Sequence, residues 1–542
     1  MVPSPGAMRP PTFTLGGRIL LNTMTAALFL RLLRLEDLSL WVDEGVTWWN
    51  ATHGSLGDAV TAEANHPPIW WLVTRVWLSF FGTSEFSMRL PAALCGAASV
   101  YLAFLLARRL FDPARVPSRG GFRGGDPAGA IWVAAFAATN AFWIEYAQEA
   151  RMYAALLAES LGLSLLYLRW LDGGRRAPLV AYSILAAVAL HTHYFAIWPI
   201  AAHAAHALFA ARSTRGDRDP VRILPLLVAQ GVAGLAFVPW FLYLAGNYRG
   251  ISADSNAPIG LLAHALWRMG IGPGLVALDR PRVEAGPAAV FRETAPIVMA
   301  TALLWLVPIG LGVRALAKDR GTRGFVLVSI AVPIALVLLA SAFGFQLVHE
   351  KYLIFLAPFL LILAVAGALA AKGVAKALLL GGLVVLHVAG LAAYHAGDTR
   401  PVRAILTGDH VYGKEQWRGA HAWVWKRAAE TDVVLLHAPF THTAWDFYDE
   451  RNPGNVRART VPRPDVPSDT RMTSAEFLKA YPEVGKAEHV FLVMSHEVTD
   501  ERDEWVGVLL GALAEAWGEV VPLPVQRFEA QWGIRVFEFA RR

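Results

Sequence analysis

The stretch Trp41–Trp71, WVDEGVTWWNATHGSLGDAVTAEANHPPIWW, decides how the chain divides into membrane and aqueous parts. It follows the first apolar segment and places two adjacent carboxylates, Asp43 and Glu44, ahead of His66, two prolines and a dense group of tryptophans. Adjacent carboxylates repel each other when both are ionised, so keeping them together favours a role with a base, a metal or a cation. Acidic residues are also common in the first turn of a solvated helix, and the stretch alone leaves that interpretation open.

The composition indicates a polytopic membrane protein. The chain has 542 residues, of which 55% are hydrophobic and 17% are charged. Its mean hydropathy of +0.40 is too high for a soluble protein of this size. The single cysteine, Cys95, excludes an internal disulfide. The opening MVPSPGAMRPPTF precedes an apolar stretch without a small-residue cleavage pattern, so we expect a retained first membrane helix.

We expect about eleven transmembrane helices, because a spanning helix needs roughly 20 apolar residues. The stretch Pro68–Phe81 is left out of this count. Its helix would be only roughly 21 Å long and carries Arg75 in its middle, so we expect it to lie along the membrane surface. The stretches expected to span are 17–35, 88–110, 129–145, 153–170, 179–192, 195–211, 223–244, 295–317, 325–343, 352–371 and 375–394.

The distribution of basic residues supports this topology through the positive-inside rule. Alternate loops collect the basic residues only if Pro68–Phe81 does not cross and if the sequence HTHY separates two short helices. The residues expected to be cytoplasmic are Arg108, Arg109, Arg115, Arg119, Arg123, Arg175, Arg176, Arg212, Arg215, Arg218, Arg222, Lys318, Arg320, Arg323, Lys372 and Lys376. The opposite face receives Asp43, Glu44, His66, Glu145, Gln148, Glu149, Arg151, His191, His193, His349, Glu350 and Lys351. This predicts a multi-pass protein of the plasma (inner) membrane whose chemistry faces the periplasm or the exterior.

The composition changes beyond Tyr394. We expect a transmembrane domain over residues 1–397 and a soluble α/β domain over residues 398–542. An odd number of spans from a cytoplasmic N-terminus places this domain on the outer side, together with the first outer loop, 36–87. The pattern predicts helices at 414–430 and 501–517 and strands at 432–437, 489–495 and 534–540.

Five segments occur in an order that resembles a known family. They are WVDEG, the stretch from NHPPIWW to LLARRLF, NAFWIEYAQEARMYAALL, LHTHYFA and HEKYLIFLAPFLLIL, and they cover most of residues 30–370. Together they resemble the bacterial branch of the protein O-mannosyltransferase superfamily, glycosyltransferase family 39, which has the GT-C fold and includes the lipid A aminoarabinose transferases as relatives. The resemblance implies an inverting transferase that uses a polyprenyl-phosphate sugar as donor on the outer face of the membrane.

The resemblance implies that Asp43 is the general base and Glu44 its acidic partner. An inverting transfer needs one carboxylate to take a proton from the acceptor hydroxyl as that hydroxyl attacks the anomeric carbon. The leaving phosphate is already acidic, so it needs cationic neutralisation more than it needs a proton.

We expect the donor phosphate to be bound by Lys351, Tyr352, Arg151 and Arg89. Family members often have Arg followed by Tyr where this chain has Lys351 and Tyr352. A lysine supplies the charge without the bidentate fork of arginine.

Four further residues are candidates for substrate binding. They are His66, Glu149, His193 and Tyr194. His66 precedes two prolines, so shaping the loop is an equal alternative. The spacing of the HTH histidines suits a cavity wall better than a metal site. We assign no metal, although a divalent cation beside Asp43 and Glu44 is chemically compatible.

The sequence leaves the acceptor open as a protein, a lipid or a glycan, and it shows no feature that indicates nucleic-acid binding. A polytopic lipid or glycan transporter or flippase is the alternative function, since the number of spans allows it. The clustering of charges on one face and the lack of a visible inverted repeat favour the transferase. A third interpretation keeps the fold but assigns only lipid or glycan binding.

Overall fold

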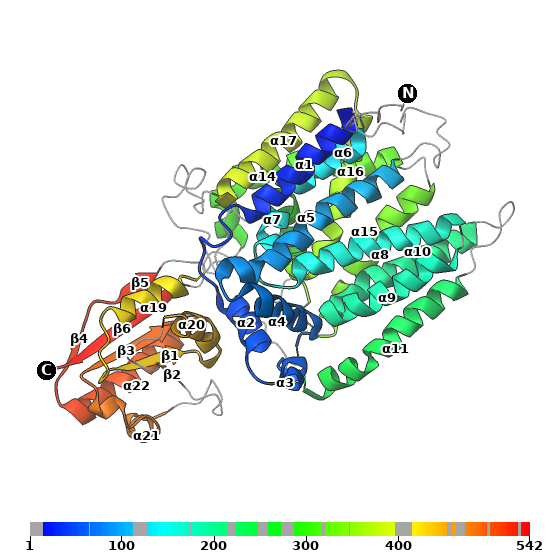
Figure 1. Cartoon of the computed structure of the whole chain (residues 1–542). Helices are drawn as coiled ribbons and strands as arrows, with labels where there is room; N and C mark the ends of the chain where they lie inside the picture. Colours follow the sequence, from blue (N-terminus) through cyan, green and yellow to red (C-terminus); the bar gives the residue numbers. More distant parts are fainter. Residues whose placement is uncertain are drawn as a thin grey trace, which may run out of the picture.

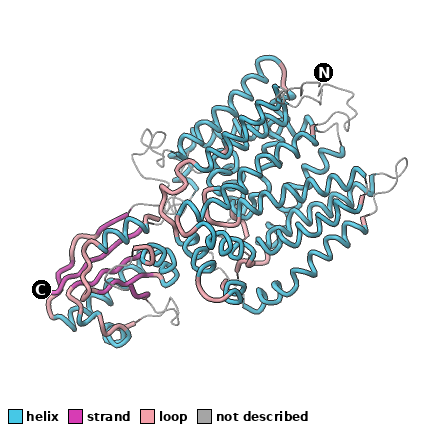
Figure 2. Tube along the Cα trace, viewed as in Figure 1, coloured by secondary structure: helices cyan, strands magenta, loops and turns pink. Residues whose placement is uncertain are grey.

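The computed structural model contains a large helical part and a smaller C-terminal part that carries the strands (Figures 1 and 2). It describes residues 15–63, 65–111, 128–173, 175–213, 223–247, 258–272, 287–316, 320–345, 347–395, 415–452, 458–461, 472–495, 499–528 and 533–542. The prediction of a mostly helical chain with a C-terminal α/β region is therefore confirmed.

Each of the eleven apolar stretches contains a helix. These helices are α1 (Leu15–Leu32), α5 (Glu85–Leu110), α6 (Ala128–Thr139), α8 (Tyr153–Gly173), α9 (Arg176–Thr192), α10 (Ile197–Ser213), α11 (Leu224–Asn247), α14 (Pro287–Ala315), α15 (Arg320–Ala342), α16 (Ala357–Ala370) and α17 (Gly373–His395). Within the described ranges, seven helices are long and apolar enough to cross a membrane. The number of eleven spans stays a prediction, because α6, α9 and α10 are shorter and α1 is not among these seven helices.

The predicted helix 129–145 is interrupted at Asn140, which separates α6 from α7 (Ala141–Ala147). The Asn140 side chain accepts a hydrogen bond from the backbone N–H of Trp143 and so caps α7. The buried guanidinium of Arg31 donates to the carbonyls of Ala137 and Ala138 at 3.2 Å, at the end of α6. Arg31 thus satisfies helix-end carbonyls inside the protein.

Helix α12 (Pro258–Ile271) was not predicted. It is only 14 residues long, and His264 and Arg268 interrupt its apolar sequence, so it lacks the pattern of a span. Its end packs closely against α14, since a Cβ at Gly270 would lie 2.5 Å from the ring of Trp305.

The first outer loop, residues 36–87, is named for its predicted side of the membrane. It folds into α2 (Val42–Thr52), α3 (Leu56–Thr61) and α4 (Ile69–Phe81). Helix α4 buries Trp70 and Trp71, while Val76 and Phe80 on its other side are 60% and 78% exposed. An exposed apolar face on a helix of about 20 Å supports the prediction that this segment lies along the membrane surface.

The C-terminal part is a six-stranded mixed sheet with the order β2-β1-β3-β6-β4, and β5 also pairs with β6. Strand β1 is parallel to β2 and β3, and β6 is antiparallel to its neighbours. The strands are β1 (Val433–His437), β2 (Ala458–Thr460), β3 (His489–Met494), β4 (Val520–Pro522), β5 (Gln526–Phe528) and β6 (Ile534–Arg541). The helices are α19 (Trp417–Trp425), α20 (His442–Asp449), α21 (Ser474–Ala480) and α22 (Thr499–Trp517). The prediction located β1, β3, β6, α19 and α22 but missed the shorter elements.

Alternation along the strands sends side chains to two separate cores. Val433 and Leu435 of β1 pack with α21 and α22, whereas Val434 and Leu436 pack with α19 and α20. The second of these cores also contains Leu40, Val42 and Trp48 from the first outer loop. The C-terminal part therefore shares a hydrophobic core with α2.

We predict that α4 does not cross the membrane, and two engineered cysteines test this. Ala62 precedes α4 and Lys372 lies between α16 and α17, and both are exposed. In intact cells, with Cys95 replaced, an impermeant thiol reagent should label Ala62→Cys and leave Lys372→Cys unlabelled. Labelling of both would mean that α4 spans, because one added crossing puts the two sites on the same side.

Candidate active site

The connection between α7 and α8, residues 148–152, contacts several of the segments that form the site. Nε2 of Gln148 lies 2.8–3.2 Å from the carbonyl oxygens of Leu30, Arg31 and Leu33, so its two N–H groups are shared among three carbonyls at the C-terminal end of α1. Two residues later, the Ala150 carbonyl accepts a hydrogen bond from the indole of Trp70 in α4. This connection thus fixes α1 and α4 at one place.

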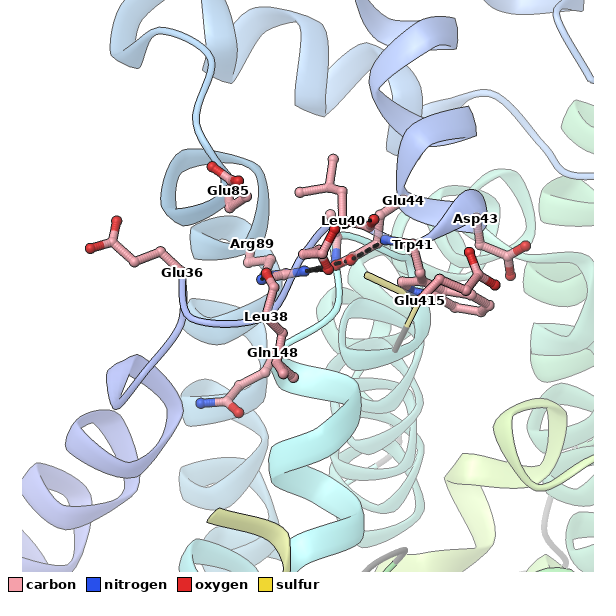
Figure 3. A network of polar contacts seen from close by, with 12 residues as sticks. Glu36, Leu38, Leu40, Trp41, Asp43, Glu44, Glu85, Arg89, Gln148 and Glu415 are labelled. Atoms are coloured by element: carbon pink, nitrogen blue, oxygen red, sulfur yellow. Dashed lines mark hydrogen bonds and ion pairs between the residues drawn. The ribbon is translucent and has the colours of Figure 1, made fainter. Parts of the chain in front are cut away.

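Glu44 and Arg89 form a buried ion pair at the same place (Figure 3). Arg89 donates from Nε and Nη2 to the two carboxylate oxygens of Glu44 at 2.8 and 2.6 Å. The carboxylate also accepts the backbone N–H of Ala150 at 2.8 Å, and neither charged side chain is more than 1% exposed. The pair therefore ties α2 to α5 and to the α7–α8 connection.

Arg89 has no donor left for a phosphate. Its other N–H groups donate to the carbonyls of Leu35, Leu38 and Ser39 at 2.8–2.9 Å, so all five are engaged. The expectation that Arg89 contacts the donor phosphate conflicts with this geometry, and we do not retain it. Its role is to order the chain that leads into α2.

Asp43 points away from Glu44, although the two are neighbours in sequence (Figure 3). The Asp43 carboxylate lies 3.6 Å from Nζ of Lys351, and the two side chains are 33% and 17% exposed. Glu44 consequently does not stand beside Asp43 as the acidic partner that the sequence led us to expect. Asp43 and Lys351 form a partly open pair from segments about 300 residues apart in the chain.

Aromatic rings surround the Lys351 ammonium group. Its Nζ lies 5.9, 5.6 and 5.6 Å from the ring centroids of Trp41, Tyr153 and Tyr352, within the range of cation–π attraction. These rings shield the cation from water, and the Asp43 carboxylate also contacts it. Tyr352, which the sequence associated with phosphate binding, therefore contacts the Lys351 ammonium group with its ring.

Arg151 also lies beside Asp43, but most of its donors are engaged. Its Nη1 donates to the Asp43 carbonyl at 3.1 Å and to the Thr47 hydroxyl at 3.3 Å, and its Nη2 lies 3.4 Å from Nε2 of His66. Its guanidinium carbon is 5.4 Å from the centroid of the Trp71 ring. Arg151 therefore holds α2 in place through Asp43 and Thr47, and it adds a positive charge next to Asp43.

His66 links Arg151 to Glu63. Because an arginine can only donate, we assign Nε2 of His66 as the acceptor and Nδ1 as the protonated atom. Nδ1 then donates to Glu63, which lies 2.6 Å away. The line from Glu63 through His66 to Arg151 fixes the orientation of the guanidinium group.

The charges in this line shift one another's pKa values. Burial alone would lower the pKa of Arg151, but Asp43, Tyr153 and Glu63 together outweigh burial, and the pKa is raised above its usual value. Burial would likewise raise the pKa of Glu63, but His66 and Arg151 outweigh it and lower the pKa. Both groups therefore remain charged at neutral pH.

His193 offers a donor to the site. It is fully buried, and its Nδ1 accepts the backbone N–H of Phe195 at 3.2 Å, so the proton is on Nε2. Among the described residues, Nε2 has no hydrogen-bond partner. The ring centroids of His66, Tyr153 and Tyr352 each lie 5.8 Å from that of His193. The predicted residues His66, His193 and Tyr352 thus come together with Asp43 and Lys351.

Tyr194 and Glu149 are the two remaining candidates for substrate binding. The Tyr194 ring centroid is 4.9 Å from that of His193. Glu149 is 5% exposed, and its charge acts on Tyr146 and Tyr394. Glu149 stays a predicted substrate-binding residue.

Sequence analysis missed a buried ionic group that supports Lys351. Arg268 of α12 donates to Glu145 at 2.5 Å and also to Glu350, which precedes Lys351. Both carboxylates are less than 10% exposed. These contacts hold the 3₁₀ segment Glu350–Leu356 against α7 and α12. The charged Arg268 inside an apolar stretch was the signal that could have identified it.

No group of three or more His, Cys, Asp and Glu side chains that could hold a metal occurs in the described part of the chain. The carboxylates of Asp43 and Glu44 also diverge, and Glu44 is bound to Arg89. A divalent cation at this pair would therefore have only Asp43 as an available ligand of the two.

Comparison with known proteins identifies the fold. No family model and no curated protein sequence matches the chain. Among solved structures, ArnT from Cupriavidus metallidurans bound to undecaprenyl phosphate is similar, with a TM-score of 0.53, 15% identity, and coverage of 97% of this chain and 98% of ArnT. The apo form of ArnT gives a TM-score of 0.49 at 15% identity, with the same coverage. The oligosaccharyltransferase AglB from Archaeoglobus fulgidus, in complex with an inhibitory peptide and a dolichol-phosphate, gives 0.46 at 12% identity and covers 97% of this chain and 74% of AglB.

The similarity to ArnT over nearly the whole of both chains shows that this protein has the GT-C fold. The fold that the five sequence segments implied is thereby confirmed.

We predict that Arg89→Met destabilises the protein by about 3–5 kcal/mol, because it leaves the Glu44 carboxylate buried without its partner. The midpoint of thermal unfolding in detergent measures the effect. Arg175→Met, at an exposed position before α9, is the matched control and should change the midpoint little. Equal shifts for the two variants would contradict the structural role of the pair.

Proposed function

We propose that this protein is an integral membrane glycosyltransferase that transfers a sugar from a polyprenyl-phosphate donor to an acceptor hydroxyl, with inversion. The observation that carries the proposal is the partly open pair of Asp43 and Lys351, built into a GT-C fold and lined by aromatic rings. ArnT, which has the same fold, was solved with undecaprenyl phosphate. An anionic base beside a cation suits a reaction in which a hydroxyl attacks and a phosphate leaves.

Asp43 is the general base in this proposal. The acceptor oxygen attacks the anomeric carbon, its proton passes to the Asp43 carboxylate, and the bond between the anomeric carbon and the phosphate oxygen breaks. The phosphate leaves with the bonding electrons. Asp43 suits this role better than Glu44, because Glu44 is saturated by Arg89 and the Ala150 amide.

Lys351 is the residue that binds the donor phosphate. Of the three candidate cations, Arg89 has all five N–H groups engaged, and Arg151 has three of its five engaged and is only 2% exposed. Lys351, in contrast, is 17% exposed and faces Asp43. Asp43 and Lys351 lie too close together for a sugar between them. Donor binding would therefore draw Lys351 from Asp43 to the phosphate and free the carboxylate to act as a base.

The remaining residues define the sugar side of the site. Nε2 of His193 can donate to a sugar hydroxyl, and the rings of Trp41, Tyr153 and Tyr352 can stack on a sugar face. His66 keeps Arg151 in position behind Asp43. We keep Glu149 and Tyr194 as supporting residues of the same wall. The donor sugar and the protein, lipid or glycan acceptor are the molecules that would occupy this wall.

We place the site on the periplasmic or extracellular face of the plasma membrane, in line with the positive-inside rule. The C-terminal α/β region, residues 398–542, would lie on the same face. The proposed partners are thus a lipid-linked donor within the bilayer and an acceptor that reaches the site from outside.

Asp43→Asn should lower the rate of sugar transfer at least ~100-fold, because the amide cannot take the acceptor proton. Transfer from a polyprenyl-phosphate sugar and thermal unfolding are measured on the same preparation. Asp58→Asn in α3 is the control, because the asparagine carbonyl can still accept the backbone N–H of Ser55, the cap of that helix. If Asp43→Asn retained near-normal turnover, Asp43 would have no part in the chemistry.

Lys351→Met should weaken the binding of undecaprenyl phosphate at least about tenfold, because a charge-assisted contact to the phosphate is lost. Lys351→Arg should keep most of the affinity, since it keeps the charge. Lys372→Met, at an exposed position, is the control for a general loss of positive charge. Unchanged affinity in Lys351→Met would move the phosphate site to another cation.

A further inference from the structure

The backbone N–H groups of Leu40 and Val42, which lie shortly before Asp43, donate hydrogen bonds to side chains of the C-terminal part. The N–H of Leu40 donates to the Tyr448 hydroxyl at 2.7 Å. The N–H of Val42 donates to the carboxylate of Glu415 at 3.1 Å. Val42 is the first residue of α2, so Glu415 also places a negative charge at the N-terminal end of this helix.

Tyr448 and Glu415 are themselves fixed. Tyr448 is 4% exposed, and its hydroxyl lies 3.1 Å from that of Ser39, which in turn accepts the backbone N–H of Arg418 at 3.0 Å. Burial raises the pKa of Tyr448 to about 12, so the hydroxyl stays protonated. Glu415 is 2% exposed and also accepts the indole N–H of Trp417 at 2.6 Å. Each contact to the loop therefore comes from an ordered side chain.

A second set of contacts holds the chain before Ser39. The guanidinium of Arg418 donates to the carbonyl of Glu36 at 2.7 Å and pairs with Glu85, the first residue of α5, at 2.8 Å. Arg451 pairs with the other oxygen of Glu85 at 2.8 Å. The C-terminal part thus bonds both to the start of the outer loop and to α5, the helix that carries Arg89.

Close packing leaves little freedom at this junction. Leu40, Val42 and Trp48 are buried in one core with residues of α19 and α20. A Cβ at Gly45 would lie 2.6 Å from the backbone nitrogen of Ala444, so α2 touches the backbone of α20 directly.

We propose that the C-terminal α/β region is a structural part of the active site: Tyr448 and Glu415 are positioning residues that hold the backbone of residues 40–42 and thereby aim Asp43. The catalytic half of this proposal rests on the proposed function. The structural half concerns only the order of residues 40–42 and stands by itself.

A pair of tyrosine variants tests the structural half. Tyr448→Phe removes the hydroxyl that holds Leu40, whereas Tyr481→Phe removes an equally buried hydroxyl that bonds to Thr460 inside the C-terminal part. Hydrogen–deuterium exchange is measured on the full chain in detergent. Tyr448→Phe should speed exchange of the amides at residues 40–42 about fivefold or more, the factor expected for one lost hydrogen bond. Tyr481→Phe should leave these amides unchanged, and equal exchange in the two variants would overturn the proposal.

Turnover tests the catalytic half. With the polyprenyl-phosphate sugar that supports transfer by the parent protein, Tyr448→Phe should lower kcat about tenfold or more while the affinity for undecaprenyl phosphate is unchanged. Tyr481→Phe should keep kcat within about twofold of the parent. Faster exchange with unchanged kcat would overturn the positioning of Asp43. A parent protein without transferase activity would instead contradict the proposed function and leave the exchange result to decide the structural half.

Glu415 provides a second and independent pair. Glu415→Gln keeps an oxygen that accepts from Val42, whereas Glu415→Ala removes it. Protection of the Val42 amide should be largely kept in Glu415→Gln and lost in Glu415→Ala. Equal protection in both variants would overturn the role of Glu415, even if Tyr448→Phe did not fold.

Discussion

The buried ion pair of Glu44 and Arg89 is the constraint on which the site depends. Removing both charges from water costs several kcal/mol, which is offset only if every donor and acceptor finds a partner. Here the carboxylate is satisfied by Arg89 and by the Ala150 amide, and the guanidinium also satisfies three carbonyls of the loop before α2. Such a set of contacts can be satisfied in only one arrangement, so it fixes α2, α5 and the α7–α8 connection relative to one another.

This constraint explains how two adjacent carboxylates acquire different roles. Successive residues of an α-helix point about 100° apart, so Glu44 cannot face Arg89 unless Asp43 faces elsewhere. The direction left to Asp43 is the one that Lys351 and the aromatic rings line. Glu44 sets the orientation of the helix, and Asp43 is the group that the helix presents.

Much of this arrangement follows from local sequence patterns, and the rest depends on contacts between distant segments. Apolar length located the long helices, and the acidic pair lies in the candidate site. The break at Asn140 was not predictable, because it is stabilised by Arg31 of another helix, more than 100 residues away. The ionic group of Arg268 was missed for the same reason, since its partners Glu145 and Glu350 lie 123 and 82 positions away. The sequence showed Arg89 as a cation, but only the structure showed that its donors were already used.

The C-terminal part also depends on contacts between segments that are distant in the sequence. A composition change suggests a separate domain, but the core on one face of its sheet is completed by Leu40, Val42 and Trp48 of the outer loop. The amides of Leu40 and Val42 would lack these partners without Tyr448 and Glu415, which lie 408 and 373 positions later. A buried amide without a partner is costly, so the turn that presents Asp43 is stable only when the last part of the chain is in place. In physical terms, the outer loop and the C-terminal sheet are therefore one unit, although the helices α5 to α17 lie between them in sequence.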